Sequence, residues 1–173
     1  MKRFLACVFA LLLTGVAAAQ PIENFDSLST AELIEVAPRT HPAALYTLSA
    51  RLLAQGRGLE AAKWMYAGQL RYRFLVAALG DDARDERVLF SALTESVGRP
   101  VNEYVAGDPE EWILAMKWAL DWDADHDNLL TSKAAFASEL ATVRSGLREL
   151  IDQVDENRDT IRRRRRESGL PVR

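Results

Sequence analysis

Apolar residues recur at intervals of three and four along most of this 173-residue chain. This spacing places side chains on one face of an α-helix. No segment combines alternating apolar and polar residues with the turn residues of a β-hairpin. The pattern predicts an all-α fold, a compact bundle of five or six helices with a long C-terminal helix.

The first nineteen residues have the composition of a secretory signal peptide. Lys2 and Arg3 precede an apolar run over residues 4–16, and the small residues that signal peptidase reads end at Ala19. That run is shorter than the roughly 20 apolar residues that a transmembrane helix needs. We therefore predict cleavage near Ala19, a periplasmic or secreted location, and no transmembrane segment after cleavage.

Cysteine content and charge constrain the mature chain. Cys7 is the only cysteine and precedes the predicted cleavage site, which leaves no disulfide and no cysteine-based metal site. Residues 20–157 carry 13 Lys and Arg against 23 Asp and Glu, whereas residues 158–173 carry seven Arg against two acids. We predict one acidic helical domain over 20–157 and a basic, mobile tail over 158–173. An acidic domain argues against nucleic acid and favours a basic protein as partner.

Capping residues mark several helix boundaries. Ser29 and Glu32 match a capping box, and Asp108-Pro109 places a cap and a first-turn proline at the start of another helix. Gly56-Arg57-Gly58 predicts a tight turn between two helices. The last helix is expected to begin near Thr131 or Ser132 and to continue into the arginine run.

Two apolar stripes predict inward-facing surfaces. Val88, Leu89, Leu93 and Val97 are expected to face the core in a helix that Gly98 terminates. The last helix carries a longer stripe with a three-four spacing. This stripe packs either along its own bundle, which we favour, or in a weak coiled-coil homodimer.

The segment over residues 44–73 resembles one tetratricopeptide or Sel1-like helical hairpin. The following residues fall near the small and aromatic positions of that pattern: Leu45, Tyr46, Ala50, Leu53, Gly56, Glu60, Ala61, Ala62 and Trp64. No second copy follows at the expected period, although such repeats stack in arrays. The resemblance implies a protein-binding helical module.

The second helix of this hairpin is apolar on much of its circumference, which places it at the centre of a bundle. Gly68 in its middle predicts a close helix crossing. Gln69 and Arg73 then lie on a partly buried face, with Glu103 or Asp108 as expected partners.

The polar and aromatic residues of this helix allow two interpretations. They form either an internal network that fixes the packing or a partner-binding site. The candidate partner-binding residues are Trp64, Gln69, Arg71, Tyr72 and Arg73.

Residues 123–134, which follow the helix that starts at Asp108-Pro109, resemble an EF-hand loop. Asp123, Asp125 and Asp127 occupy its first, third and fifth positions, and helices are expected on both sides. Ala134 stands where the family has its bidentate Glu. The resemblance implies calcium binding through the three aspartates; the alternative is a polar connector whose acids cap the next helix.

No catalytic motif is present in the sequence. Only His41 and His126 supply imidazole, no serine lies in a nucleophile elbow, and no glycine-rich phosphate loop occurs. The Arg162–Arg166 run is either a solvated helix end or binds anionic lipid, an acidic polymer or the acidic domain itself.

We therefore expect a binding protein rather than an enzyme, and no cofactor. The most concrete form of this prediction is an inhibitor or immunity-type partner of an exported enzyme or toxin, or an envelope adaptor. The alternative function is a calcium-binding module.

Overall fold

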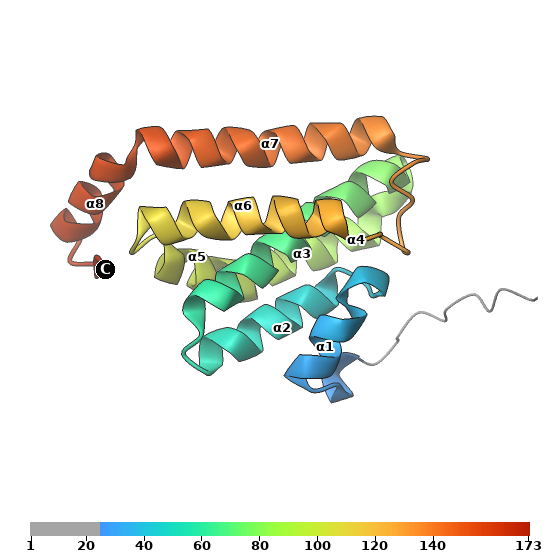
Figure 1. Cartoon of the computed structure of the whole chain (residues 1–173), viewed down its shortest axis with the longest axis horizontal. Coiled ribbons are helices and arrows are strands. Elements are labelled where there is room, and N and C mark those ends of the chain that lie inside the picture. The colour runs from blue at the N-terminus through green and yellow to red at the C-terminus, as the bar shows by residue number, and fades with distance from the viewer. Residues whose placement is uncertain (1–24) are drawn as a thin grey trace, which may run out of the picture.

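The structure, a computed structural model, describes residues 25–173, so the predicted signal peptide lies outside the described residues. Within this part of the chain there is no β-strand, and the prediction of a compact all-α fold is confirmed. No helix in residues 25–173 is both long and apolar enough to cross a bilayer. The α-helices are α1 (Thr30–Val36), α2 (Ala43–Ala54), α3 (Gly58–Leu79), α4 (Arg84–Leu93), α5 (Arg99–Val105), α6 (Pro109–Asp125), α7 (Ala137–Glu156) and α8 (Arg158–Glu167) (Figure 1).

Two helix starts follow the predicted caps. The Ser29 hydroxyl accepts the Glu32 N–H, and the Glu32 carboxylate accepts the Ser29 N–H, which completes the capping box of α1. At α6, the Asp108 carboxylate accepts the N–H groups of Glu110 and Glu111. These signals act within one helical turn, so sequence alone places them.

Helix α3 lies at the centre of the fold, between α2 and α6 (Figure 1). A Cβ added at Gly68 would lie 3.1 Å from the Leu45 Cβ, which confirms the predicted close crossing of α2 and α3. The turn that precedes α3 contains Gly56 with φ of 75°, a conformation that glycine adopts without steric cost.

Helices α4 and α5 are continuous through a π-helical turn at Thr94–Gly98, so the prediction that the helix ends at Gly98 is wrong. The Arg99 N–H donates to the Thr94 carbonyl across this wide turn. Pro100 follows and has no N–H to donate. The helix therefore continues through the π turn, and the missing N–H of Pro100 leaves no backbone donor without an acceptor there.

Helix α7 begins at Ala137, so the start predicted at Thr131 or Ser132 is wrong. The Asn128 side chain accepts the N–H groups of Leu130 and Thr131 and holds this segment in a turn. The long helix also breaks at Asn157, and α8 begins at Arg158. The apolar stripe of α7 buries Leu147, Ile151 and Val154 against the rest of the molecule.

Candidate functional site

Helix α4 buries none of its residues and exposes an apolar outer face. Val88 is 68% exposed and Leu89 43% exposed, so the prediction that both face inward is wrong. Leu93 and Val97 pack against the core as predicted, and Phe90 packs there as well. The row at 90, 93 and 97 takes the inward side of the helix, which turns the neighbouring row at 88 and 89 toward solvent.

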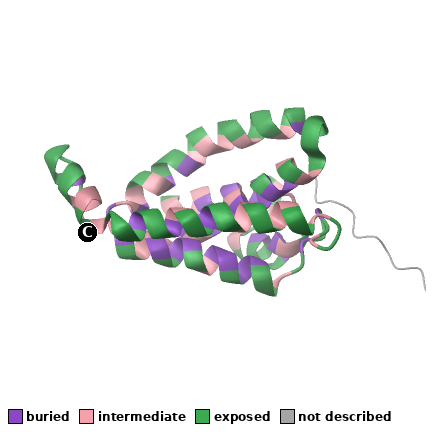
Figure 2. Ribbon diagram, turned by 90° about the horizontal axis from the view of Figure 1, so that it is seen from above, coloured by how far each residue is buried: buried purple, intermediate pink, exposed green. Residues whose placement is uncertain are grey.

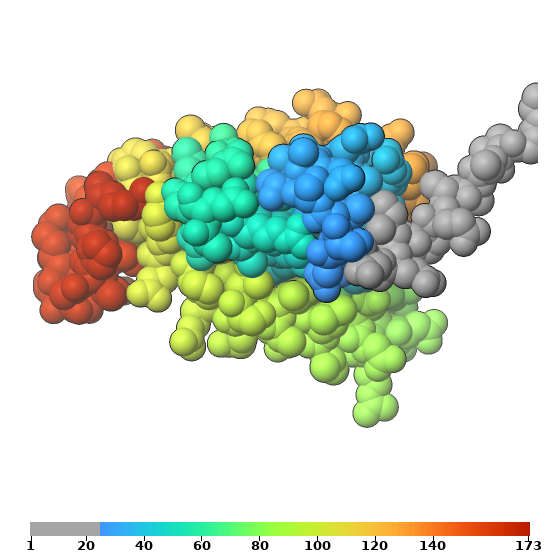
Figure 3. All heavy atoms as spheres, turned by 90° about the horizontal axis from the view of Figure 1, so that it is seen from below, coloured from blue at the N-terminus to red at the C-terminus, as the bar shows by residue number. Residues whose placement is uncertain are grey.

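Charged side chains of both signs lie near these apolar residues in the chain, because Arg84 and Arg87 are exposed on the same helix as Asp85. Leu79 at the end of α3 is 39% exposed, and the next segment carries exposed Asp81, Asp82 and Asp85. None of the three carboxylates forms an ion pair with any residue in 25–173. We name this surface the α4 face and define it by Leu79, Asp81, Asp82, Asp85, Val88 and Leu89. In the view from below, the segment that carries it projects from the body of the molecule (Figure 3).

A second feature is a groove between α3, α4 and α7, here named the α7 groove. It has a volume of about 470 Å³. In the view from above, the continuous helix formed by α4 and α5 arches away from the rest of the molecule (Figure 2). The groove is lined by Gln69, Leu70, Arg73, Val76, Ala77, Phe90, Thr142, Val143, Gly146, Leu147 and Leu150.

Two of the five predicted partner-binding residues line the α7 groove. Gln69 is half-buried and Arg73 is exposed, and both lie on one row of α3. The Arg73 guanidinium carbon lies 5.7 Å from the centre of the Phe90 ring. The prediction that Glu103 or Asp108 pairs with these residues is wrong, because Asp108 instead caps α6 and Arg73 forms no ion pair with the described residues.

Arg71, the third predicted residue, is buried and belongs to an internal network. It is 1% exposed, and its Nε lies 3.2 Å from Oδ1 of Asp123, which is fully buried. Its two Nη atoms donate to the carbonyls of Ala37, Pro38, His126 and Asp127. Burial lowers the pKa of Arg71, and Asp123 opposes this effect. Arg71 thus ties α3 to the segments before α2 and after α6.

Two further cations contact the same carboxylate. Oδ2 of Asp123 lies 3.2 Å from Nη1 of Arg144 and 3.6 Å from Nζ of Lys133. Lys133 also donates to the His126 carbonyl at 2.7 Å. Burial lowers the pKa of Lys133, with Asp123 again opposing. Asp123 therefore joins α3, α7 and the preceding loop.

Trp64 and Tyr72, the other two predicted residues, are also buried. The Trp64 ring lies 5.1 Å from that of Trp118 and 5.2 Å from that of Trp122, in edge-on contacts. The Tyr72 hydroxyl donates to Oε2 of Glu86 at 2.6 Å, and burial raises the pKa of Tyr72. Trp64, Arg71 and Tyr72 thus serve the packing in this conformation, as the first of the two interpretations expects.

His41 fixes the position of α4 together with Tyr72. Its Nδ1 accepts the Ala43 N–H, so Nε2 carries the proton that faces Glu86 at 3.2 Å. Glu86 on α4 thereby receives hydrogen bonds from two residues of the neighbouring elements. This cluster holds the inner side of α4 and leaves its outer face to solvent.

The three predicted calcium ligands do not form a cluster. Asp123 and Asp125 lie in the last turns of α6, Asp127 follows the helix, and Asp123 faces three cations. Within the described residues, no group of three His, Cys, Asp or Glu side chains is placed to hold a metal ion. The EF-hand resemblance receives no support from this arrangement.

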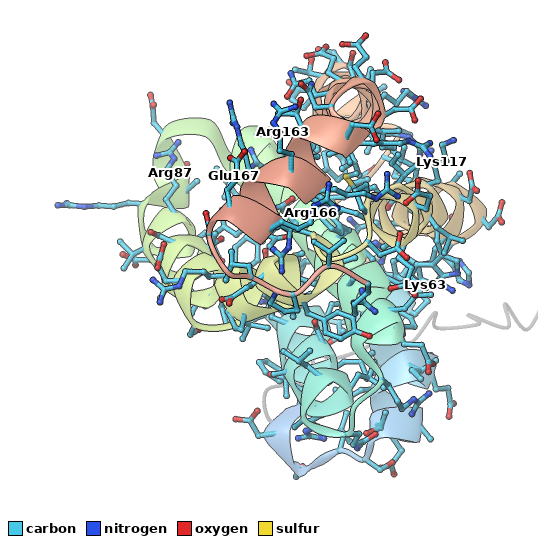
Figure 4. All side chains as sticks on the ribbon, turned by 90° about the vertical axis from the view of Figure 1, so that its left-hand side faces the viewer. Lys63, Arg87, Lys117, Arg163, Arg166 and Glu167 are labelled. Atoms are coloured by element: carbon cyan, nitrogen blue, oxygen red, sulfur yellow. The ribbon has the colours of Figure 1, made fainter. Side chains whose placement is uncertain are left out.

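Residues 158–173, predicted as a mobile basic tail, have specific contacts with the acidic domain. Arg158 and Arg162 both bind the Glu110 carboxylate. Arg173 donates to Oε2 of Glu111 at 2.6 Å and to the Tyr104 hydroxyl at 2.8 Å. Figure 4 views the molecule from this end. The acidic domain of the same chain is thus one partner of the arginine run. The mobility of the tail stays a prediction.

Two arginines of α8 point away from Glu110. Arg163 lies near Glu167 on the same helix, with Nε and Oε1 3.9 Å apart (Figure 4). Arg166 is exposed on the same short helix. Of the run, Arg162 and Arg163 form ion pairs within the described residues, and Arg165 donates to the Pro171 carbonyl. Arg164 and Arg166 are exposed and form no ion pair there, so binding of an external anion by the run stays a prediction.

Comparison with protein-family models, with curated proteins and with solved structures found no match for this chain. The repeat-family and EF-hand resemblances therefore stay predictions. The helical hairpin itself is present as α2 and α3.

Sequence reasoning missed the groove residues contributed by α4 and α7. No pattern in the sequence marks Phe90, and Gly146 lies beside the apolar stripe of α7 rather than within it. A Cβ added at Gly146 would meet no heavy atom within 4 Å. Glycine in the interior of a long amphipathic helix was the one available signal for a gap at this position.

Proposed function

We propose that this protein is an exported binding protein without catalytic turnover, and that the α4 face contacts a basic protein partner. The observation that carries the proposal is the exposure of Val88 and Leu89 at 68% and 43% on a helix with no buried residue. Exposed apolar residues gathered on one surface and bordered by polar groups are typical of protein-binding sites.

Three unpaired carboxylates of the α4 face support a basic partner. Asp81, Asp82 and Asp85 are exposed and have no ion-pair partner in the described residues. Carboxylates at the rim of an apolar patch accelerate association with a positively charged surface and disfavour an acidic one. An inhibitor or immunity-type partner of a basic exported enzyme or toxin meets this requirement, and so does an envelope adaptor.

Contacts within the protein hold α4 in place before a partner binds. Tyr72 and His41 hold Glu86 on its inner side, and the Phe90 ring stacks on Tyr72 with 4.9 Å between ring centres. A surface that is ordered before binding loses little conformational entropy on binding.

Affinity capture with matched variants tests the proposal. The tagged protein is incubated with an envelope extract, alongside the double variant Val88→Asp/Leu89→Asp and the control Leu129→Asp. Leu129 is 65% exposed and lies far along the chain from α4. We expect wild type and control to retain the same basic protein in stoichiometric amount, and the double variant to lose it.

Ionic strength provides a second readout in the same experiment. Because the rim charges are exposed, we expect retention by the wild type to weaken as salt rises. A protein retained equally by the double variant, or one that is acidic and insensitive to salt, would contradict the proposal.

A further inference from the structure

The α7 groove has the composition of a site for a small amphiphile. Its wall combines leucine, valine and phenylalanine side chains with a single charged side chain, that of Arg73. Pockets of about 300–1,000 Å³ with mostly apolar walls and a few polar groups are typical of small-molecule sites. At about 470 Å³, the α7 groove falls within this range.

Arg73 determines the charge that the occupant must carry. Its guanidinium has no ion-pair partner among the described residues, and no acidic side chain lines the groove. Arginine binds a carboxylate through two parallel N–H donors, and one arginine balances one negative charge. Gln69 beside it can add a neutral hydrogen bond. This end of the site is therefore suited to a monocarboxylate.

The Phe90 ring supports Arg73 in this role. The guanidinium carbon lies 5.7 Å from its centre, and Phe90 is itself stacked on the buried Tyr72. An aromatic ring attracts a cation placed over its face. Arg73 is thus held beside the apolar wall although its side chain is exposed.

The remaining wall sets the size and shape of the apolar part. The α7 residues that line the groove run from Thr142 to Leu150. At a rise of 1.5 Å per residue this stretch is about 12 Å long. A single extended alkyl chain can lie along a stretch of this length.

We propose that the α7 groove binds a medium-chain fatty acid, with its carboxylate on Arg73 and its alkyl chain between α3 and α7. This inference is independent of the proposed protein partner, because the α4 face lies on the outer side of α4 and the α7 groove on its inner side. Small residues make room for the chain: Ala77 on α3 and Gly146 on α7. Gly146 is exposed, and a Cβ added there would meet no heavy atom within 4 Å.

Calorimetric titration of the purified protein with decanoate, below the concentration at which decanoate forms micelles, tests the inference. We expect saturable binding with one molecule per chain. Decanol, which has the same chain without the charge, is expected to bind at least tenfold more weakly. Absence of saturable decanoate binding, or equal binding of decanol, would overturn the inference.

Three variants test whether decanoate binds in the α7 groove. Arg73→Met is expected to abolish the preference for decanoate over decanol, and Gly146→Leu to prevent binding of both by filling the groove. Arg148→Met serves as the control, because Arg148 lies on the same helix but does not line the groove. Wild-type affinity in Arg73→Met or in Gly146→Leu would contradict the assignment.

A measurement on the wild type keeps the test valid if a variant fails to fold. In a ¹⁵N-labelled sample, decanoate is expected to shift the amide signals of Gly146 and Leu147. The signal of Leu129, outside the groove, should stay in place. Shifts confined to residues outside the groove lining would reject the site.

Discussion

Arg71 and Asp123, which lie 52 residues apart in the sequence, form a salt bridge in which neither side chain is more than 1% exposed. Arg144 and Lys133 contact the same carboxylate. A single buried anion is thus the common partner of α3, α7 and the loop between α6 and α7.

Replacing Asp123 should therefore destabilise the fold strongly. Asp123→Asn removes the negative charge that compensates the buried Arg71, and loss of one partner of a buried ion pair costs about 3–5 kcal/mol. Urea unfolding followed by circular dichroism measures the change. Asp125→Asn is the matched control, because Asp125 is exposed, and its effect should stay within about 0.5 kcal/mol. Equal stability of the two variants would disprove the structural role of Asp123.

Calcium should not change the melting temperature of the wild type. Asp123 is paired with three cations, and the described residues offer no cluster of three metal-ligating side chains. Thermal unfolding with calcium and with a chelator measures this. A calcium-dependent rise that Asp125→Ala with Asp127→Ala removes would restore the EF-hand interpretation. These two positions are the appropriate variants, because substitution of Asp123 alters the fold itself.

Substitution of two glycines in helix interiors should change the free energy of unfolding in opposite directions. Gly68→Leu places a side chain against Leu45 and the Tyr46 ring, both within 3.2 Å of the added Cβ, and overpacking of this kind costs about 1–3 kcal/mol. Gly146→Ala meets open space, so the better helix propensity of alanine should stabilise α7 by up to about 1 kcal/mol. The free energies of unfolding in urea measure both changes. A neutral Gly68→Leu would contradict the close α2–α3 crossing.

Acid should release α8 from α6. Hydrogen bonds from Arg162, the largest cause, and from Arg158 lower the pKa of Glu110 from 4.5 to about 2. Because this pKa is lower in the folded than in the unfolded state, the stabilisation is complete above pH 4.5 and is lost as the pH falls toward 2. Glu110 is half-exposed, so salt should weaken the same contact.

NMR can follow this release through the amide signals of α8 relative to those of α3. We expect the α8 signals to move first as the pH falls, and Glu110→Gln to show the released positions already at pH 7. If the α8 signals of Glu110→Gln matched those of the wild type at pH 7, Glu110 would not hold the tail.

Features predicted correctly from the sequence depend on short stretches of chain. The capping box of Ser29 and Glu32, the Asp108 cap and the Gly56 turn each involve residues within one helical turn. The Gly68 crossing was also predictable, because a glycine in the middle of an apolar helix lowers helix stability and is best compensated by the close approach of a second helix.

Features predicted wrongly depend on how distant helices pack. The periodicity of α4 gives two adjacent apolar rows, and only the contacts of Phe90, Leu93 and Val97 with the core decide which row is buried. Likewise, Asp123 near the end of α6 and Arg71 on α3 give no sign in the sequence that they are partners. Gln69 and Arg73, predicted as candidate partner-binding residues, line the α7 groove, and their role stays a prediction. Phe90 and Gly146 join the groove only through the packing of α4 and α7 against α3.

Photo-crosslinking from position 88 is the most direct test of the proposed function. A photoreactive amino acid replaces Val88, or Leu129 as control, in the cell that makes the protein. We expect one crosslinked product from position 88, which contains a basic exported protein and is absent from position 129. The same products from both positions, an adduct between two copies of this chain, or no adduct from position 88 would contradict the proposed function.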